Sequence, residues 1–236
     1  MRDRERFRAM HDATVLSWGR ELPILGEWHE ASGDPGAYFF QDQLVARWIY
    51  EASPTRHVDI GSRIDGFIGH LSVFREVEVI DLRPLPMKIP RVRFHQLDLM
   101  QPIPQEWIES TDSLSCLHTI EHFGLGRYGD ELDPLGHEKG LSQMLKMVSP
   151  GGRFYLSTPV GRERVEFNAH RIFAPDTILS WFSEDWTIEK SAVIDDDLRV
   201  TESAGVDALR EAKCDSGVGM VCVKKLKKRS FLEDRR

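Results

Sequence analysis

The chain has 236 residues, of which 41% are hydrophobic and 29% are charged, as is typical of a globular protein with one large domain. Its formal net charge of −7 argues against broad nucleic-acid binding, because phosphate contacts require a basic surface. Three widely spaced cysteines suggest neither a disulfide framework nor a zinc ribbon, and no run approaches the roughly 20 apolar residues that span a bilayer. Because the charged N-terminus lacks an apolar signal segment, we expect a cytoplasmic protein.

Apolar residues at helical spacing predict an amphipathic helix over residues 37–52. From residue 56 onward, short β-branched runs alternate with helical segments, which indicates βαβ units and a mostly parallel sheet. The predicted strands cover residues 56–61, 76–82, 91–99, 112–120, 153–159, 186–194 and 218–226. The other predicted helices cover residues 65–74, 140–148 and 175–182. Such sheets bind ligands at the carboxyl ends of their strands, so the candidate site residues are those that follow each strand.

The first predicted strand ends in a glycine-containing turn, in the stretch DIGSRIDG (59–66). It is not the G-x-G-x-x-G fingerprint of dinucleotide enzymes, because Arg63 stands at the second glycine position. It is not a P-loop either, because Phe67 stands where the lysine belongs. Since the second glycine lets the backbone approach a pyrophosphate, its absence favours a ligand without one.

Acidic residues follow the next two predicted strands. Asp81 lies 20 residues after Gly61, the spacing at which a carboxylate accepts ribose hydroxyls in mononucleotide-binding halves. We expect Asp98, at the end of the third strand, to accept a hydrogen bond from an adenine amino group. The apolar residues expected to flank the ring are Leu97, Leu99 and Met100. The order of glycine turn, Asp81 and Asp98 therefore predicts a nucleoside site.

A family resemblance is carried by the stretches HVDIGSRIDG, VIDL, QLDL, SCLHTIEHF and LKMVSPGGRFYLSTP. Over roughly residues 56–160 the chain resembles the class I S-adenosylmethionine-dependent methyltransferases. A narrower resemblance is carried by FFQDQLVARWIY, EHFGLGRYGD and EFNAHRIFAP. These stretches are similar to an uncharacterised bacterial group, domain of unknown function 268, which is associated with polysaccharide biosynthesis.

The resemblance implies an α/β fold with a Rossmann-like, seven-stranded, mostly parallel sheet, helices on both faces and a C-terminal antiparallel hairpin. It implies a methyltransferase domain over residues 56–229, an N-terminal helical extension over 1–55 that packs on this domain, and a tail over 230–236. The implied cofactor is S-adenosyl-L-methionine. Its implied contacts are Asp59, Gly61, Ser62 and Arg63 at the methionine end, Asp81 and Leu82 at the ribose, Asp98 and Leu99 at the adenine, and His118 beside the sulfonium.

The stretch HTIEH (118–122) matches the H-x-x-E-H pattern of a zinc-protease class. Because it follows a predicted strand, its two histidines need not share a helical face, which argues against a protease. Glu121, His122 and His170 could instead form an acid/base site, in which a neutral imidazole takes a hydroxyl proton. They could also hold a divalent ion. We predict the acid/base site and no metal, and leave the divalent ion as the alternative.

We predict an S-adenosylmethionine-dependent O-methyltransferase that acts on a hydroxyl of a saccharide or another small polar acceptor. The alternatives are a nicotinamide-dependent or nucleotide-sugar-modifying Rossmann enzyme, and a non-catalytic binding module that keeps the cofactor fold. The glycine-rich stretch 124–140 is long enough for a substrate-binding loop, and its candidate contacts are Arg127, Tyr128 and Asp130. We expect a small-molecule or glycan partner and no nucleic acid.

Overall fold

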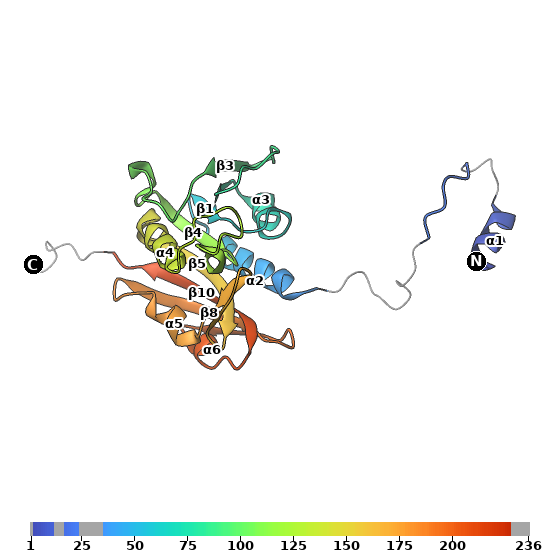
Figure 1. Cartoon of the computed structure of the whole chain (residues 1–236). Helices are drawn as coiled ribbons and strands as arrows, with labels where there is room; N and C mark the ends of the chain where they lie inside the picture. The colour runs from blue at the N-terminus through green and yellow to red at the C-terminus, as the bar shows by residue number, and fades with distance from the viewer. Residues whose placement is uncertain (1, 12–16, 24–34, 228–236) are drawn as a thin grey trace, which may run out of the picture. The chain divides into compact units, whose positions relative to one another are not determined.

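The structure is a computed structural model that describes residues 2–11, 17–23 and 35–227. The chain forms two compact units, residues 1–34 and 35–236. The first contains helix α1 (Arg2–Met10), and the second contains the sheet (Figure 1). Within the described residues, no helix is both long and apolar enough to cross a bilayer. The tail expected over residues 230–236 lies outside the described residues, and the expected domain boundaries stay a prediction.

The second unit contains every predicted strand and helix in the predicted order, together with further short elements that were not predicted. Its helices and helical turns are α2 (Ala37–Ala52), η2 (Ile64–Ile68), α3 (Gly69–Phe74), η3 (Gln105–Trp107), η4 (Ile120–His122), α4 (Gly136–Met147), α5 (Pro175–Ser180) and α6 (Asp207–Arg210). Its strands are β1 (His57–Ile60), β2 (Val77–Asp81), β3 (Val92–Gln96), β4 (Thr111–Leu117), β5 (Val148–Gly161), β6 (Arg164–Glu166), β7 (His170–Ile172), β8 (Trp186–Ile194), β9 (Val200–Ala204) and β10 (Ser216–Lys225).

The main sheet has the strand order β3-β2-β1-β4-β5-β10-β8-β9. Strands β3 to β5 pair in parallel, whereas β10 runs antiparallel to both of its neighbours, β5 and β8. The α/β fold and the late antiparallel strands are therefore confirmed. The number of strands is wrong: the described residues form eight strands in this sheet, because β9 pairs antiparallel with β8 at its edge. A separate hairpin pairs β6 with β7.

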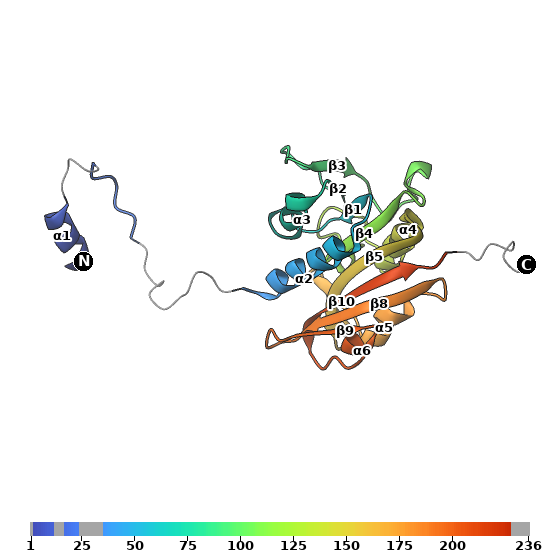
Figure 2. The same ribbon diagram turned by 180° about the vertical axis from the view of Figure 1, so that it is seen from behind.

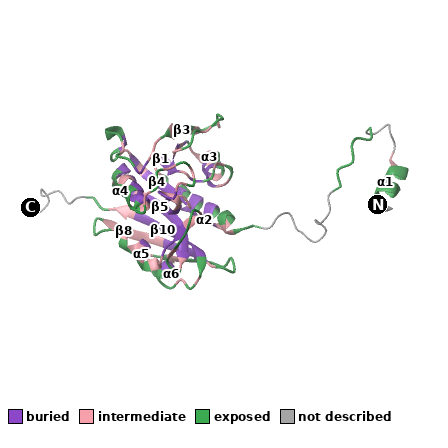
Figure 3. Ribbon diagram, in the orientation of Figure 1, coloured by how far each residue is buried: buried purple, intermediate pink, exposed green. Residues whose placement is uncertain are grey.

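Helices cover both faces of the sheet, which gives three layers (Figures 1 and 2). On one face, α2, η2 and α3 pack on a cluster that includes Met220 and Cys222 of β10. On the other face, α4, α5 and α6 pack on a cluster that includes Val221 and Val223 of the same strand. Alternate residues of β10 thus enter opposite clusters, and the central strands are buried on both sides (Figure 3). This explains the continuous apolar runs in their sequences.

Helix α2 forms because its apolar residues recur on one face, and Leu44, Val45, Trp48 and Ile49 are buried. It ends at Ser53, which adopts a left-handed conformation with φ of 45°. The Trp48 indole donates a hydrogen bond of 2.7 Å to the Glu202 carboxylate on β9. Because α2 lies across the sheet, its first turn reaches the carboxyl ends of β4 and β5, where the candidate site lies.

Candidate functional site

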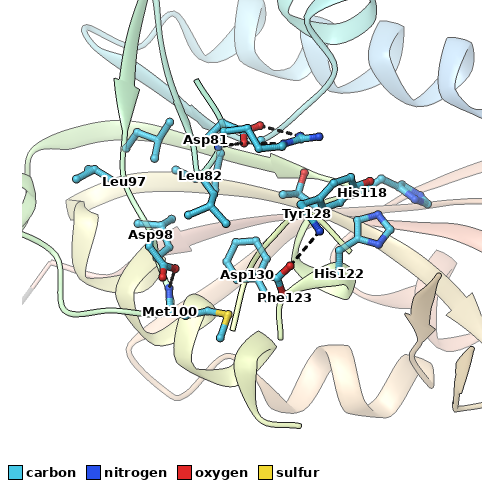
Figure 4. A pocket seen from close by; sticks show the side chains of 16 residues that line it. Asp81, Leu82, Leu97, Asp98, Met100, His118, His122, Phe123, Tyr128 and Asp130 are labelled. Carbon is cyan, nitrogen blue, oxygen red and sulfur yellow. Dashed lines mark hydrogen bonds and ion pairs between the residues drawn. The ribbon is translucent and has the colours of Figure 1, made fainter. Parts of the chain in front are cut away.

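A cavity lies at the carboxyl ends of β1, β2, β3 and β4 (Figure 4). In an open α/β sheet this is the edge at which ligands bind, and β1 and β4 flank the point where the strand order reverses. The cavity is lined by Ile60, Gly61, Ile80, Asp81, Leu82, Arg83, Leu97, Asp98, Leu99, Met100, His118, Thr119, His122, Phe123, Tyr128 and Asp130. Most of the residues predicted to bind ribose and adenine therefore meet in one place.

The glycine turn is held from below by Asp59. Its carboxylate accepts hydrogen bonds from the Ser62 backbone N–H (2.9 Å), the Ser62 hydroxyl (2.7 Å) and the Ser115 hydroxyl. Gly61 has φ of 65°, and a Cβ at this position would overlap the methyl group of Thr119. Only glycine meets both the conformational and the steric requirement. The turn therefore needs glycine at position 61, where the backbone passes close to Thr119.

Asp59 itself does not line the cavity. The residue is fully buried, and burial raises the pKa of its carboxyl to about 6 despite the hydrogen bonds from Ser115 and Ser62, which lower it. The family resemblance implies that this residue contacts the methionine end of the cofactor, and that role stays a prediction. In the structure the Asp59 carboxylate accepts hydrogen bonds from Ser62 and Ser115 and thereby shapes the turn.

Asp81 is engaged by a neighbouring cation. Its Oδ1 accepts hydrogen bonds from the Arg83 backbone N–H (2.8 Å) and Nε (3.1 Å), and its Oδ2 accepts one from Arg83 Nη2 (3.1 Å). The Arg83 guanidinium lies 4.1 Å from the centroid of the Tyr128 ring. Leu82, the other predicted ribose contact, also lines the cavity. The sequence contained no sign that Asp81 would already have a partner.

The adenine end of the predicted site is apolar with one carboxylate. Asp98 Oδ1 accepts the Met100 backbone N–H at 2.8 Å, and Oδ2 makes no hydrogen bond within the described part of the chain. Leu99 and Met100 are buried beside it, and Leu97 and Phe123 complete the wall. The cavity therefore offers apolar surface for a flat ring and one free acceptor at its edge.

A second cavity adjoins the first. The two share Gly61, Asp81, Arg83, His118, His122 and Tyr128 as walls. The second cavity is also lined by the other predicted site residues except Asp59, namely Ser62, Arg63, Glu121 and His170. Arg63 is exposed and forms an ion pair of 2.9 Å with Asp65. In dinucleotide enzymes this position is a glycine, which lets the backbone approach the pyrophosphate of the cofactor. Here the Arg63 side chain stands at that position.

His118 follows β4 directly and takes a left-handed conformation, with φ of 48°. Its Nδ1 lies 3.0 Å from Glu121 Oε1 and 3.4 Å from the Tyr38 hydroxyl. The Tyr38 and His118 rings meet edge to face, with centroids 4.9 Å apart. Because His118 stands outside the short turn η4, the HTIEH stretch does not form the helix that a zinc-protease signature requires.

Glu121 is only 1% exposed, and its Oε2 and the Nε2 of His118 are buried without a hydrogen-bond partner. Burying a carboxylate oxygen without a partner is costly, and native proteins rarely do so without a reason. Both unpartnered atoms belong to residues that line the second cavity. They suit a ligand that carries positive charge or a hydroxyl group.

His122 is held in one tautomer. Its Nδ1 donates a hydrogen bond of 2.7 Å to the Ala169 carbonyl, which can only accept, so Nε2 carries the lone pair in the neutral ring. Burial lowers the pKa of His122, although the neighbouring Glu121 opposes this shift. Nε2 lies 3.8 Å from Glu121 Oε1. A neutral, oriented imidazole on the wall of both cavities is suited to accept a proton.

His170 comes from β7 and also lines the second cavity, and its ring centroid is 6.5 Å from that of His122. Its Nε2 lies 3.4 Å from the Glu166 carboxylate. The structure thus brings Glu121, His122 and His170 to one cavity, as predicted. Within the described residues, however, no group of three His, Cys, Asp or Glu side chains is arranged to hold a metal ion.

Sequence reasoning missed the contribution of helix α2. Gln41 and Asp42 are buried on its face and line the second cavity. Gln41 accepts a hydrogen bond of 2.6 Å from Ser157 on β5 and donates one of 2.9 Å to Asp42. Burial raises the pKa of Asp42, and Gly66 packs directly against its carboxylate. Two adjacent polar residues in an amphipathic pattern look like a solvated face, so only the fold reveals them.

Sequence reasoning also missed Arg171. This residue is 5% exposed, and its guanidinium donates hydrogen bonds to backbone carbonyls only. Its four acceptors are the carbonyls of Glu121, Phe123, Asp133 and Pro134, at 2.6 to 3.4 Å. Arg171 thereby ties strand β7 to both ends of the loop between β4 and α4. No sequence pattern identifies an arginine that binds main-chain carbonyls.

The comparisons with known proteins support the fold and leave the chemistry open. Residues 91–183 match a family described as a Caenorhabditis protein of unknown function, DUF268. The resemblance to group 268 is therefore confirmed over that region, whereas its description as bacterial is wrong. The comparison with curated proteins finds no match.

Among solved structures, the chain is similar to a putative sarcosine dimethylglycine methyltransferase from Galdieria sulphuraria (TM-score 0.56, 11% identity, 80% of this chain and 85% of that one). It is similar to the N-methyltransferase NodS from Bradyrhizobium japonicum in complex with S-adenosylhomocysteine (TM-score 0.53, 13% identity, 82% and 90%). It is also similar to the [4+2]-cyclase SpnF (TM-score 0.54, 14% identity, 79% and 82%). A cyclase among these neighbours illustrates that a fold can host more than one reaction. The chain therefore has the Rossmann-like fold of S-adenosylmethionine-dependent methyltransferases.

Proposed function

We propose that this protein binds S-adenosyl-L-methionine and transfers its methyl group to a hydroxyl of a saccharide or another small polar acceptor. The observation that carries the proposal is the pair of adjoining cavities. One offers an apolar slot with Asp81 and Asp98 at the ribose and adenine positions, and the other presents a neutral, oriented His122. Polar and charged side chains, among them Gln41, Arg63 and Asp65, line the second cavity, which suits a polar acceptor rather than an apolar one.

The residues present fit this cofactor if Arg83 gives up part of its hydrogen bonding to the Asp81 carboxylate. An ionised carboxylate offers about four lone-pair sites, and Arg83 uses three of those on Asp81. A ribose diol needs two acceptor sites, so at least one Arg83 bond must open. The Arg83 side chain is 51% exposed, and an ion pair of this kind contributes about 0–1 kcal/mol. Two ribose hydroxyls can therefore displace part of it.

The remaining fit comes from the unpartnered buried atoms. Glu121 Oε2 and His118 Nε2 lie where the methionine end meets the acceptor cavity, and a carboxylate at this point complements a cationic sulfonium. Asp98 Oδ2 is free to accept the adenine amino group. When bound, the cofactor supplies an electrophilic methyl group whose bonding electron pair stays with the departing sulfur.

The chain's own contribution is proton transfer and orientation. His122 Nε2 takes the proton of the acceptor hydroxyl as its oxygen forms the new bond to carbon, and Ala169 keeps the ring turned toward it. His122 then returns this proton to solvent. Because burial lowers the pKa of His122, its neutral form persists to lower pH than that of an ordinary histidine. The rate should therefore stay level above pH 6.5 and fall only at lower pH.

Calorimetric titration with S-adenosylhomocysteine tests cofactor binding. We expect stoichiometric binding to the wild type and at least tenfold weaker binding to Asp81→Ala. The matched control is Asp197→Ala, because Asp197 forms the same type of i, i+2 ion pair, with Arg199 at 2.9 Å, away from both cavities. No heat with folded wild-type protein, or equal affinity for Asp81→Ala, would contradict the proposal. Binding of NAD instead would favour the nicotinamide alternative.

Labelled S-adenosylmethionine, tested against a panel of sugars, nucleotide sugars and lipid-linked glycans, tests methyl transfer. With any acceptor found, we expect His122→Gln to lower kcat at least a hundredfold and to abolish the fall in rate at low pH. His70→Gln is the control, because the His70 ring also binds a backbone carbonyl, that of Gly66 at 2.9 Å, outside both cavities. Full activity in His122→Gln would exclude His122 as the base.

A further inference from the structure

Three arginines line the second cavity, and they differ in their partners. Arg63 forms an ion pair with Asp65, and Arg83 forms one with Asp81. Arg127 has no carboxylate within ion-pairing distance in the described part of the chain. Among the three arginines that line this cavity in the described part of the chain, only Arg127 therefore lacks an acidic side chain to balance its charge.

The position of Arg127 is fixed by the same carbonyl that orients His122. The Ala169 oxygen accepts His122 Nδ1–H at 2.7 Å and Arg127 Nη1–H at 2.8 Å. The imidazole and the guanidinium therefore lie side by side, and their donor atoms are no farther apart than these two distances together. Both side chains line the second cavity, so a single acceptor bound there can contact both.

The loop that carries Arg127 is also built to present it. Asp130 accepts the backbone N–H groups of Gly126 and Tyr128, both at 3.1 Å, which closes a tight turn around Arg127. The Arg127 guanidinium lies 5.2 Å from the Tyr128 ring centroid. Only Nη1 is used in a hydrogen bond, so Nε and Nη2 remain available. A planar guanidinium with free donors matches the paired oxygens of a phosphate or carboxylate.

We propose that the acceptor carries an anionic group, a phosphate or a carboxylate, which Arg127 holds beside the hydroxyl that gives its proton to His122. This inference rests on the proposed function and narrows its substrate class from polar acceptors to anionic ones. Because Arg127 and His122 both donate to the Ala169 carbonyl, that carbonyl fixes their relative positions. It thereby sets the distance between the bound anion and the reacting hydroxyl.

The test compares glucose 1-phosphate, glucuronate and glucose as probes, each titrated with and without saturating S-adenosylhomocysteine. Binding is followed by calorimetry and by the NMR signals of the His122 ring. We expect one or both anions to bind at least tenfold more tightly than glucose, and Arg127→Gln to remove that advantage. The two anionic arms distinguish a phosphate from a carboxylate. The matched control is Arg91→Gln, because Arg91 is exposed and donates to one backbone carbonyl, that of Val73 at 3.0 Å.

The two proposals can fail separately. Anions that bind no better than glucose, or that bind Arg127→Gln as well as wild type, overturn the anionic acceptor even where S-adenosylhomocysteine binds. Binding of the anions through Arg127 in a protein that shows no heat with S-adenosylhomocysteine supports the anion site and rejects the proposed cofactor. Loss of anion binding in Arg91→Gln as well would assign the effect to net charge and overturn the inference.

Discussion

The carboxyl group of Asp59 gives the sharpest test of how this site is built. It lies fully buried under the glycine turn, where burial raises its pKa from 3.8 to about 6 and the hydrogen bonds from Ser115 and Ser62 only partly oppose that shift. Between pH 3.8 and 6 the folded protein therefore holds a proton that the unfolded chain has released. The contribution of Asp59 to stability is full below pH 3.8 and is lost as the pH rises through 6.

Replacing Asp59 by Asn removes this titration and keeps the shape of the side chain. A pKa difference of about two units corresponds to about 3 kcal/mol, at 1.36 kcal/mol per unit. We therefore expect Asp59→Asn to gain about 3 kcal/mol of stability relative to wild type between pH 3.5 and 7.5. His57 acts in the opposite sense, because burial lowers its pKa to about 3, but its titration is common to both proteins and cancels in the difference.

Urea unfolding of both proteins, followed by circular dichroism at several pH values, measures this difference. Asp197→Asn is the control for the same chemical change at an exposed site. A constant difference for Asp59→Asn would refute the reasoning. A difference that falls with rising pH would mean that the serine hydrogen bonds outweigh burial and that the native carboxyl is already ionised at low pH.

Two further substitutions test the turn and the loop. Gly61→Ala should lower the free energy of unfolding by about 2 kcal/mol or more, because the left-handed conformation costs alanine about 1–2 kcal/mol and its Cβ overlaps Thr119. Thr119→Ser in the same protein should restore part of this loss, and no recovery in urea unfolding would rule out the steric explanation. Arg171→Leu leaves four carbonyls without their donor, so we expect a loss of at least about 3 kcal/mol. Hydrogen exchange should then speed up in residues 121–135, and unchanged exchange there would show that Arg171 does not fix the loop.

The central strands, and the meeting of Gly61, Asp81 and Asp98 at one cavity, could be predicted because their signals are local. β1 and β2 are short apolar runs, and each is followed at its carboxyl end by a turn or an acidic residue. A parallel sheet brings such ends together whatever the details of packing, so the joint position of Gly61, Asp81 and Asp98 follows from order alone.

The parts that could not be predicted depend on contacts between distant segments. Strand β9 was missed because VTESA is short and mostly exposed, and it is a strand only through its pairing with β8. The partner of Asp81, the buried carboxylate of Asp42 and the carbonyl contacts of Arg171 have no sequence signature. Each depends on which surface a side chain meets after folding, and periodicity carries no information about that.

The position of β10 affects how the protein is made. It is the last strand along the described chain, yet it lies between β5 and β8 in the sheet. During synthesis on the ribosome, β8 and β9 emerge as a hairpin that has no place to dock until β10 follows. The edges of β5 and β8 then remain unpaired and open to other chains. A nascent chain halted before residue 216 should therefore depend on chaperones and be prone to aggregation, although every proposed cofactor contact has already been synthesised.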